Sequence, residues 1–310
     1  MGDMIAAHAD WSTDPRKRWM SQARRLDGQW YATAPQPVGD VATLLPRLLA
    51  PALPVAFGLD LPLGLPREYA ATRPEAGFAA FLQGLAANPG FFQVSAGLET
   101  VSHARPFYPA RGIAGMTRAA HAAALGLSGP LGLSRWCDRA TAERPAGAPL
   151  FWTLGANQSG KAAIAAWRDW IVPGLAAGAP IRLWPFEGGL HALLAPGVAV
   201  LAEVYPAEAL RHCGLKLGGS KRAEAPRRAL APALRAAMAA RRLVPDAALA
   251  AAVDAGFGAD AAGEDRFDSV IGLLGLIGVL DGARPDFVPD DPWIRRWEGW
   301  VLGQTALPRA

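Results

Sequence analysis

The sequence is poor in the residues that build disulfide scaffolds and zinc sites. Only two of its 310 residues are cysteine, Cys137 and Cys213, and only five are histidine. Two cysteines so far apart form neither a disulfide framework nor a zinc site, and the histidines lack metal-ligand spacing. This scarcity excludes a small disulfide-stapled fold, and it predicts a reducing, cytoplasmic location.

Charged residues are also scarce. They make up 19% of the chain, below the usual ~25%, whereas 51% of the residues are hydrophobic. A sizeable core is therefore expected, and wholesale disorder is excluded. The net charge of +4 is too small to indicate a nucleic-acid partner by itself. However, the stretch 211–242 holds nine basic residues and a single acid, Glu224. It is either a solvated helical face or a phosphate-facing surface.

Long hydrophobic runs are missing as well. The apolar run Ser269 to Leu280 is too short to span a bilayer. No charged start followed by an apolar segment opens the chain, so no signal peptide is expected. The sequence shows no internal repeat and no low-complexity segment. We therefore expect no association with a membrane, and the oligomeric state stays open.

The stretch PVAFGLDLPLGLP, residues 54–66, is the most informative in the chain. Its apolar run Val55 to Leu59 predicts a strand that is buried on both faces. Asp60 follows at the carboxyl end of this strand, where open α/β sheets place groups that contact ligands. The prolines and glycine after it prevent a simple continuation of the strand. Alternatively, Asp60 only caps the turn through its own backbone.

The residues before this stretch predict an antiparallel meander of three strands. The expected strands are Ile5 to Trp11, Lys17 to Leu26 and Gln29 to Thr33, and Asp27-Gly28 between the last two is a strong hairpin signal. A helix over Val38 to Leu49 follows, because its apolar residues recur at helical spacing.

The character of the chain changes after residue 66. Short helices are expected at 78–85, 116–125 and 161–170, without a clear series of strands. Strands return at 181–186 and 198–205, and helices follow at 222–242, 245–255 and 268–280. We therefore divide the chain into the first half of a core (1–66), a large and mostly helical insertion or lid (67–179), and the second half of the core with C-terminal helices (180–310).

Four acids occupy unusual positions. Asp10 lies on the first strand, Asp60 ends a buried strand, Glu203 lies near the end of another, and Asp268 opens an apolar helix. Carboxylates in apolar strands are costly unless they are paired or bind a cation. If the fold brings these acids together, Mg²⁺ or Mn²⁺ would relieve their repulsion. Asp268 could instead be a helix cap, a common role for Asp at that position.

A second motif competes with the acids. The segment GANQSGKA, residues 155–162, resembles a phosphate-binding loop, but Ala162 stands where such a loop has the hydroxyl that holds Mg²⁺. We do not expect ATP to bind there in the usual manner. Lys161 could still bind an anion at the start of its helix. The glycines of the segment could also simply shape a loop.

A series of short motifs resembles a known family. HADWS, GLDLPLGLP, RWCDRATAERP, GANQSGKAAI, RLWPFEGG, AEVYPAEAL and DRFDSVIGLL occur in that order. This series is similar to the domain of unknown function 429 family, whose members are predicted ribonuclease H-like nucleases. The resemblance extends from about Ala6 to Leu280.

The resemblance implies an α/β fold with a ribonuclease H-like mixed five-strand core sheet, helices and a large insertion that the minimal nuclease fold lacks. It implies Asp10 as the first-strand acid, Asp60 as the fourth-strand acid and Asp268 as the late-helix acid, all three as metal ligands. Glu203 would be a further catalytic acid, and Asp265 a further ligand or only a cap.

The expected function is metal-dependent hydrolysis of phosphodiester bonds with Mg²⁺ or Mn²⁺ as cofactor and nucleic acid as partner. Lys161 and the basic residues of 211–242 would neutralise phosphate. Two alternatives stay open. One is an ATP-dependent phosphotransferase on a related actin-like core, although no duplicated halves are visible in the sequence. The other is a binding protein that keeps the fold without catalysis.

Overall fold

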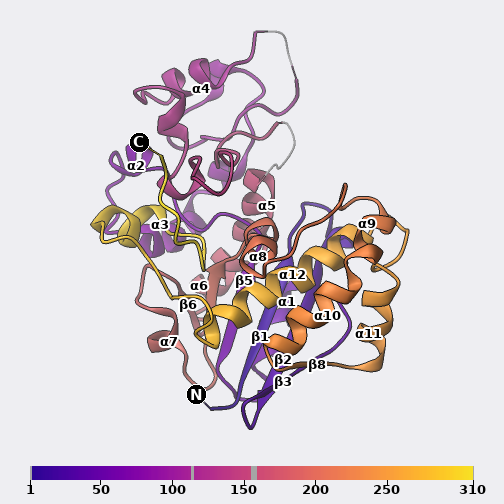
Figure 1. Cartoon of the computed structure of the whole chain (residues 1–310). Coiled ribbons are helices and arrows are strands. Elements are labelled where there is room, and N and C mark those ends of the chain that lie inside the picture. Colours follow the sequence, from indigo (N-terminus) through magenta and orange to yellow (C-terminus); the bar gives the residue numbers. More distant parts are fainter. Residues whose placement is uncertain (1, 113–114, 155–158, 310) are drawn as a thin grey trace.

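The computed structural model describes residues 2–112, 115–154 and 159–309. It is an α/β fold built on a mixed eight-stranded sheet with the strand order β6-β7-β5-β1-β2-β3-β8, in which β4 pairs with β2 off this path (Figure 1). The strands are β1 Met4–Asp10, β2 Trp19–Leu26, β3 Gln29–Ala32, β4 Gln36–Pro37, β5 Val55–Leu59, β6 Ile181–Leu183, β7 Ala199–Glu203 and β8 Leu243–Pro245.

Helices surround this sheet and fill the region between β5 and β6. They are α1 Val41–Leu49, α2 Arg67–Ala70, α3 Phe78–Gly84, α4 Arg118–Ala124, α5 Ser159–Ala166, α6 Val172–Ala176, α7 Leu190–Leu193, α8 Pro206–His212, α9 Glu224–Ala229, α10 Ala231–Ala240, α11 Ala247–Asp254 and α12 Gly263–Leu280. No helix in the described part of the chain combines the length and the apolar character that crossing a membrane requires.

The predicted antiparallel meander is confirmed, with one change at its start. Asp27 and Gly28 both have positive φ, 49° and 78°, as the two-residue hairpin between β2 and β3 requires. The expectation that the second strand begins at Lys17 is wrong, because Pro15–Lys17 form a 3₁₀ turn. The Asp14 side chain accepts a hydrogen bond from the backbone of Arg16 and stabilises this turn, so β2 begins at Trp19.

The expectation of a five-strand sheet is too small, since three short strands extend it. β6 pairs with β7 at one edge, β8 pairs with β3 at the other, and β4 pairs with β2. Strand β8 lies between two stretches that the sequence predicted as helices, and both helical predictions are confirmed by α9, α10 and α11. Three residues are too few to show a period of two, and Pro245 at the edge is a residue that discourages a strand prediction.

One face of the sheet is covered by α1 and by the segment 159–176. The Trp170 ring lies 5.5 Å from the Phe57 ring of β5 and 5.6 Å from the Trp11 ring. The last part of the expected insertion 67–179 is therefore packed on the core. Its described remainder holds α2 to α4, 3₁₀ turns and isolated bridges, and α4 stands apart from the sheet in Figure 1. The boundaries 1–66, 67–179 and 180–310 stay a prediction.

The opposite face is covered by α12, together with α10 and α11 (Figure 1). Helix α12 begins at Gly263, so the expectation that Asp268 opens it is wrong. Glu264 and Asp265 occupy the first turn, where acids favour the helix dipole. Asp268 lies in the second turn and is not a cap; its side chain pairs with Lys221 instead.

Helix α12 approaches β1 closely at Gly272. The His8 ring of β1 is fully buried below this glycine and shares a 3.1 Å hydrogen bond with the backbone oxygen of Val204. A Cβ atom at Gly272 would overlap the His8 ring. The missing side chain therefore sets the distance between the helix that carries Asp268 and the strand that carries Asp10.

We predict that Gly272→Ala destabilises the protein by about 1–3 kcal/mol, because an overpacked core must shift. Gly84→Ala is the control: Gly84 ends α3 with open space around it, so alanine should leave stability unchanged or raise it by up to ~1 kcal/mol. Denaturant unfolding measures both. Equal stability of the two variants would show that the close approach of α12 is not needed.

Candidate functional site

Asp10 and Asp60 are brought together by the parallel pairing of β1 and β5. Ala9 lies opposite Leu59 in this register, and the backbone amide of Asp60 donates a 3.1 Å hydrogen bond to the oxygen of Ala9. The next residue on each chain is therefore the pair Asp10 and Asp60. Because side chains alternate along a strand, both carboxylates point to the face that α12 covers.

Asp268 reaches the same place from α12. It is 4% exposed, and one of its carboxylate oxygens pairs with the ammonium of Lys221. The same ammonium lies 3.4 Å from Glu264 Oε1. Lys221 precedes α9 and belongs to the basic stretch 211–242. The structure thus joins three of the four predicted acids and adds a lysine to them.

Burial and mutual repulsion change the acidity of these groups. Burial and the Asp268 charge together raise the pKa of Asp60 to about 7, against the opposing charge of Lys221. The pKa of Asp10 lies well above its usual range because the group is buried and because Asp60 and Asp268 are close. Burial raises the pKa of Asp268 to about 6, although Lys221 opposes that shift. When the three carboxylates are ionised, the single positive charge of Lys221 is therefore not enough to neutralise them.

Several oxygen atoms of the cluster have no partner. No residue in the described parts of the chain donates a hydrogen bond to the carboxylate of Asp10 or Asp60, and Asp265 Oδ2 is buried without a hydrogen bond. Burial and the neighbouring Glu264 raise the pKa of Asp265. Unpaired carboxylate oxygens are the ligands that Mg²⁺ and Mn²⁺ prefer. Asp10, Asp60 and Asp268, with Asp265 beside them, thus have the chemistry of ligands for a divalent cation, but their oxygens do not all lie within 4.8 Å of one another.

Glu203 has a different environment from the other three acids. It pairs with Leu59 in the β5–β7 register, so its side chain points to the opposite face of the sheet from Asp60. The buried Arg135 guanidinium binds both of its oxygens at 2.6 and 2.7 Å, and the amide of Leu63 donates at 2.8 Å. Its charge still raises the pKa of Asp60. The structure therefore places Glu203 in a satisfied ion pair next to the cluster.

The phosphate-loop prediction is only partly described. Residues 155–158 lie outside the described residues. Lys161 is half-buried on α5 and makes no hydrogen bond or ion pair with another described residue. It does not line the cavity beside Asp60. The structure thus does not bring Lys161 to the three acids.

The basic stretch 211–242 is mostly committed to contacts within the protein. Arg227 is buried and donates to the backbone oxygens of Gly256 and Gly258. Arg228 and Arg235 pair with surface acids. Lys221 and Arg211 are the members that line the cavity beside Asp60. Of the basic residues in 211–242 that were predicted to face phosphate, these are the two that line the cavity.

Two groups of three ligand-type side chains have their ligand atoms within 4.8 Å of one another in the described part of the chain, and Asp10, Asp60 and Asp268 do not form such a group. They are Cys137, Asp138 and Glu203, and Glu143, Glu208 and His212. In each group a buried carboxylate is already neutralised by arginine: Arg135 lies 2.8 Å from Asp138, and Arg211 lies 2.7 Å from Glu208. Guanidinium groups occupy the place that a cation would need, so these groups are structural ion pairs.

Comparison with known proteins adds no relative: no protein-family model, no curated protein and no solved structure matches the chain. The fold and the geometry of the acids are therefore the basis for a function.

Sequence reasoning missed two residues of this region. Arg135, in the motif RWCDRATAERP, is a buried arginine that bridges two acids distant in sequence from each other. Lys221 was one of nine basic residues in its stretch, and its contact with Asp268 depends on the packing of α12. No periodicity signals either contact. The run GGSK before a helix, where a loop approaches other elements, is the only local signal at Lys221.

We predict that Asp60→Asn stabilises the metal-free protein at pH 8. A raised folded pKa means that the folded state binds the Asp60 proton more tightly than the unfolded state. Its stabilising contribution is present below about pH 4 and lost as pH rises through about 7. Asparagine removes this loss, so the variant should gain about 1 kcal/mol at pH 8, or ~2–4 °C in melting temperature.

Thermal melts in EDTA at pH 5 and pH 8 check this. The gain of the variant over the parent should shrink at pH 5, where the parent carboxyl is protonated. A variant that is less stable than the parent at pH 8, by the ~0.5–2 kcal/mol of a lost cap, would make Asp60 a structural residue.

Proposed function

We propose that this protein is a metal-dependent nuclease with a ribonuclease H-like core. The observation that carries the proposal is the position of Asp10 and Asp60 at the ends of the neighbouring parallel strands β1 and β5, with Asp268 of α12 beside them. A cation at this end of the sheet would relieve the repulsion among these carboxylates, which Lys221 balances only in part.

The topology supports the same proposal. The five strands β3-β2-β1-β5-β7 are adjacent in the sheet, the first three along the chain are antiparallel, and β5 and β7 run parallel to β1. The resemblance to the domain of unknown function 429 family implies a mixed five-strand core that begins with three antiparallel strands, and these five strands agree with that expectation. The extra strands β4, β6 and β8 are additions at its edges.

The chain's own residues account for much of the chemistry. Asp10, Asp60 and Asp268 would hold Mg²⁺ or Mn²⁺, which supplies charge neutralisation at the phosphate and an activated water when bound. Lys221 keeps a positive charge next to Asp268 and lines the adjacent cavity. Its ammonium would bind a non-bridging phosphate oxygen. Glu203, held by Arg135, adds negative charge near Asp60.

The cytoplasmic location belongs to this proposal too. Both cysteines are free, and Cys137 is buried.

We predict that Mn²⁺ raises the melting temperature of the parent and leaves that of Asp10→Asn nearly fixed, since a ligand that binds only the folded state stabilises it. Hydrolysis of labelled DNA and RNA should need Mg²⁺ or Mn²⁺ and should be lost in Asp10→Asn.

Lys221→Met gives a sharper test of the cluster. Removing the built-in cation should tighten Mn²⁺ binding by roughly tenfold, about 1.4 kcal/mol, while it weakens hydrolysis. Lys216→Met, at an exposed lysine, is the matched control and should change neither. Isothermal titration with Mn²⁺ reads the affinity. Weaker Mn²⁺ binding in Lys221→Met would contradict a metal site at these acids.

The phosphotransferase alternative has its own measurement. Titration with ATP and Mg²⁺ should show no micromolar binding. Micromolar binding that Lys161→Ala abolishes would favour a phosphotransferase. A binding protein without catalysis would instead be indifferent to chelator.

A further inference from the structure

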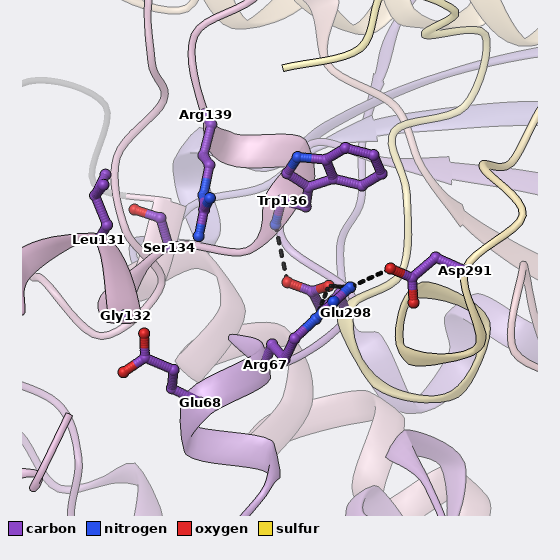
Figure 2. A pocket seen from close by; sticks show the side chains of 9 residues that line it. All are labelled: Arg67, Glu68, Leu131, Gly132, Ser134, Trp136, Arg139, Asp291 and Glu298. Atoms are coloured by element: carbon purple, nitrogen blue, oxygen red, sulfur yellow. Dashed lines mark hydrogen bonds and ion pairs between the residues drawn. The ribbon is translucent and has the colours of Figure 1, made fainter. Parts of the chain in front are cut away.

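Two cavities of the protein differ in how the polar groups on their linings are satisfied. The cavity in Figure 2 has a volume of about 220 Å³. Arg67 there binds Asp291 at 2.6 Å and Glu298 at 2.9 Å, and Glu298 also accepts a 2.9 Å hydrogen bond from the amide of Trp136. These three charges are mutually paired, whereas Arg139 on the same lining has a buried Nε without a hydrogen-bond partner among the described residues.

The second cavity is larger, about 360 Å³, and it opens beside Asp60 and Lys221. Small apolar residues line its walls on two sides, at 145–148 and at Pro206 and Ala207. Arg211, whose side chain is 35% exposed, lies on the same lining. Arg211 pairs with Glu208 at 2.7 Å and Lys221 pairs with Asp268, so the cavity combines apolar walls with paired charges, directly next to Asp60.

Two buried polar atoms of residues on this lining have no hydrogen-bond partner among the described residues. They are the indole nitrogen of Trp11 and the hydroxyl of Ser159. Trp11 is 5% exposed, and its ring faces are already used, by Trp170 at 5.6 Å and by the guanidinium of Arg18 at 4.9 Å. The N–H edge of the Trp11 ring is the part that these contacts leave unused. A buried donor without an acceptor costs about 1–3 kcal/mol, and a bound ligand would remove that cost.

We propose that this cavity binds one unpaired nucleotide, with its base between the apolar walls and its phosphate toward Lys221 and Arg211. The proposal rests on the proposed nuclease function and names its substrate class: strands with unpaired nucleotides. Trp11 donates to an acceptor on the base edge, and Ser159 donates or accepts. A volume of 360 Å³ is near the lower end of the ~300–1,000 Å³ range of ligand pockets. The cavity has room for one nucleotide but not for a base pair. A nucleotide held there would place its phosphate next to Asp60.

Equilibrium titration with the four nucleoside 5′-monophosphates, and with inorganic phosphate, in Mg²⁺ tests the pocket without requiring hydrolysis. At least one monophosphate should bind ten or more times more tightly than phosphate. Trp11→Phe and Ser159→Ala should each weaken that binding about three- to tenfold, the effect of one lost uncharged hydrogen bond, and leave phosphate binding unchanged.

Ser95→Ala is the matched control. It also removes a buried, unpaired hydroxyl, and it lies away from the cavity, so it should have no effect. Equal affinity for phosphate and for all four nucleotides would overturn the proposal, as would Trp11→Phe and Ser159→Ala variants that bind like Ser95→Ala.

The same protein then meets a labelled 16-nucleotide strand, single or annealed to its complement as a blunt duplex. Hydrolysis should prefer the single strand at least tenfold, because a paired base cannot enter. Hydrolysis of both forms at one rate would overturn the pocket and keep the nuclease. Nucleotide binding without any hydrolysis would instead keep the pocket and overturn the nuclease.

Discussion

The backbone pairing of β1 with β5 imposes the main electrostatic constraint on this protein. Parallel hydrogen bonds hold Ala9 opposite Leu59, so Asp10 and Asp60 must leave the sheet side by side. Helix α12 then covers them, and it can come close because Gly272 has no side chain above His8. Asp60 raises the pKa of Asp10, the Asp268 charge raises the pKa of both, and Lys221 balances these acids only in part. This repulsion is a property of the fold, and it is the basis of the proposed cation site.

A second buried network in the same molecule contains acids whose charges are paired with an arginine. Arg135 neutralises Glu203 and Asp138 and donates to the backbone oxygen of Leu63. Removing one member of such a network typically costs about 3–5 kcal/mol, since a charge is left buried alone. This network joins residues 135–138 to Glu203 at the end of β7 and to the backbone oxygen of Glu298 in the C-terminal segment. The contrast separates acids that hold the structure together from acids that remain free for a ligand.

Local patterns were sufficient for the central strands. Apolar runs ended by turn residues predict β1, β5 and β7, and the Asp27-Gly28 hairpin defines β2 and β3. Asp10 and Asp60 share an edge because β1 pairs with β5 in parallel, and no local pattern shows that pairing. Long-range contacts could not be predicted from local sequence patterns. The partner of Glu203 lies 68 residues away at Arg135, and Lys221 meets Asp268 across 47 residues. Strand β8 and the early start of α12 also depend on tertiary pairing, which overrides weak local signals.

Diffraction from crystals soaked in Mn²⁺ tests the central claim most directly, because manganese scatters anomalously and marks its own position. We expect an anomalous peak within the ~2.0–2.6 Å of an oxygen ligand from the carboxylates of both Asp10 and Asp60, with Lys221 moved away from Asp268. A peak confined to other acids, or no peak at millimolar Mn²⁺, would contradict a metal site at the ends of β1 and β5.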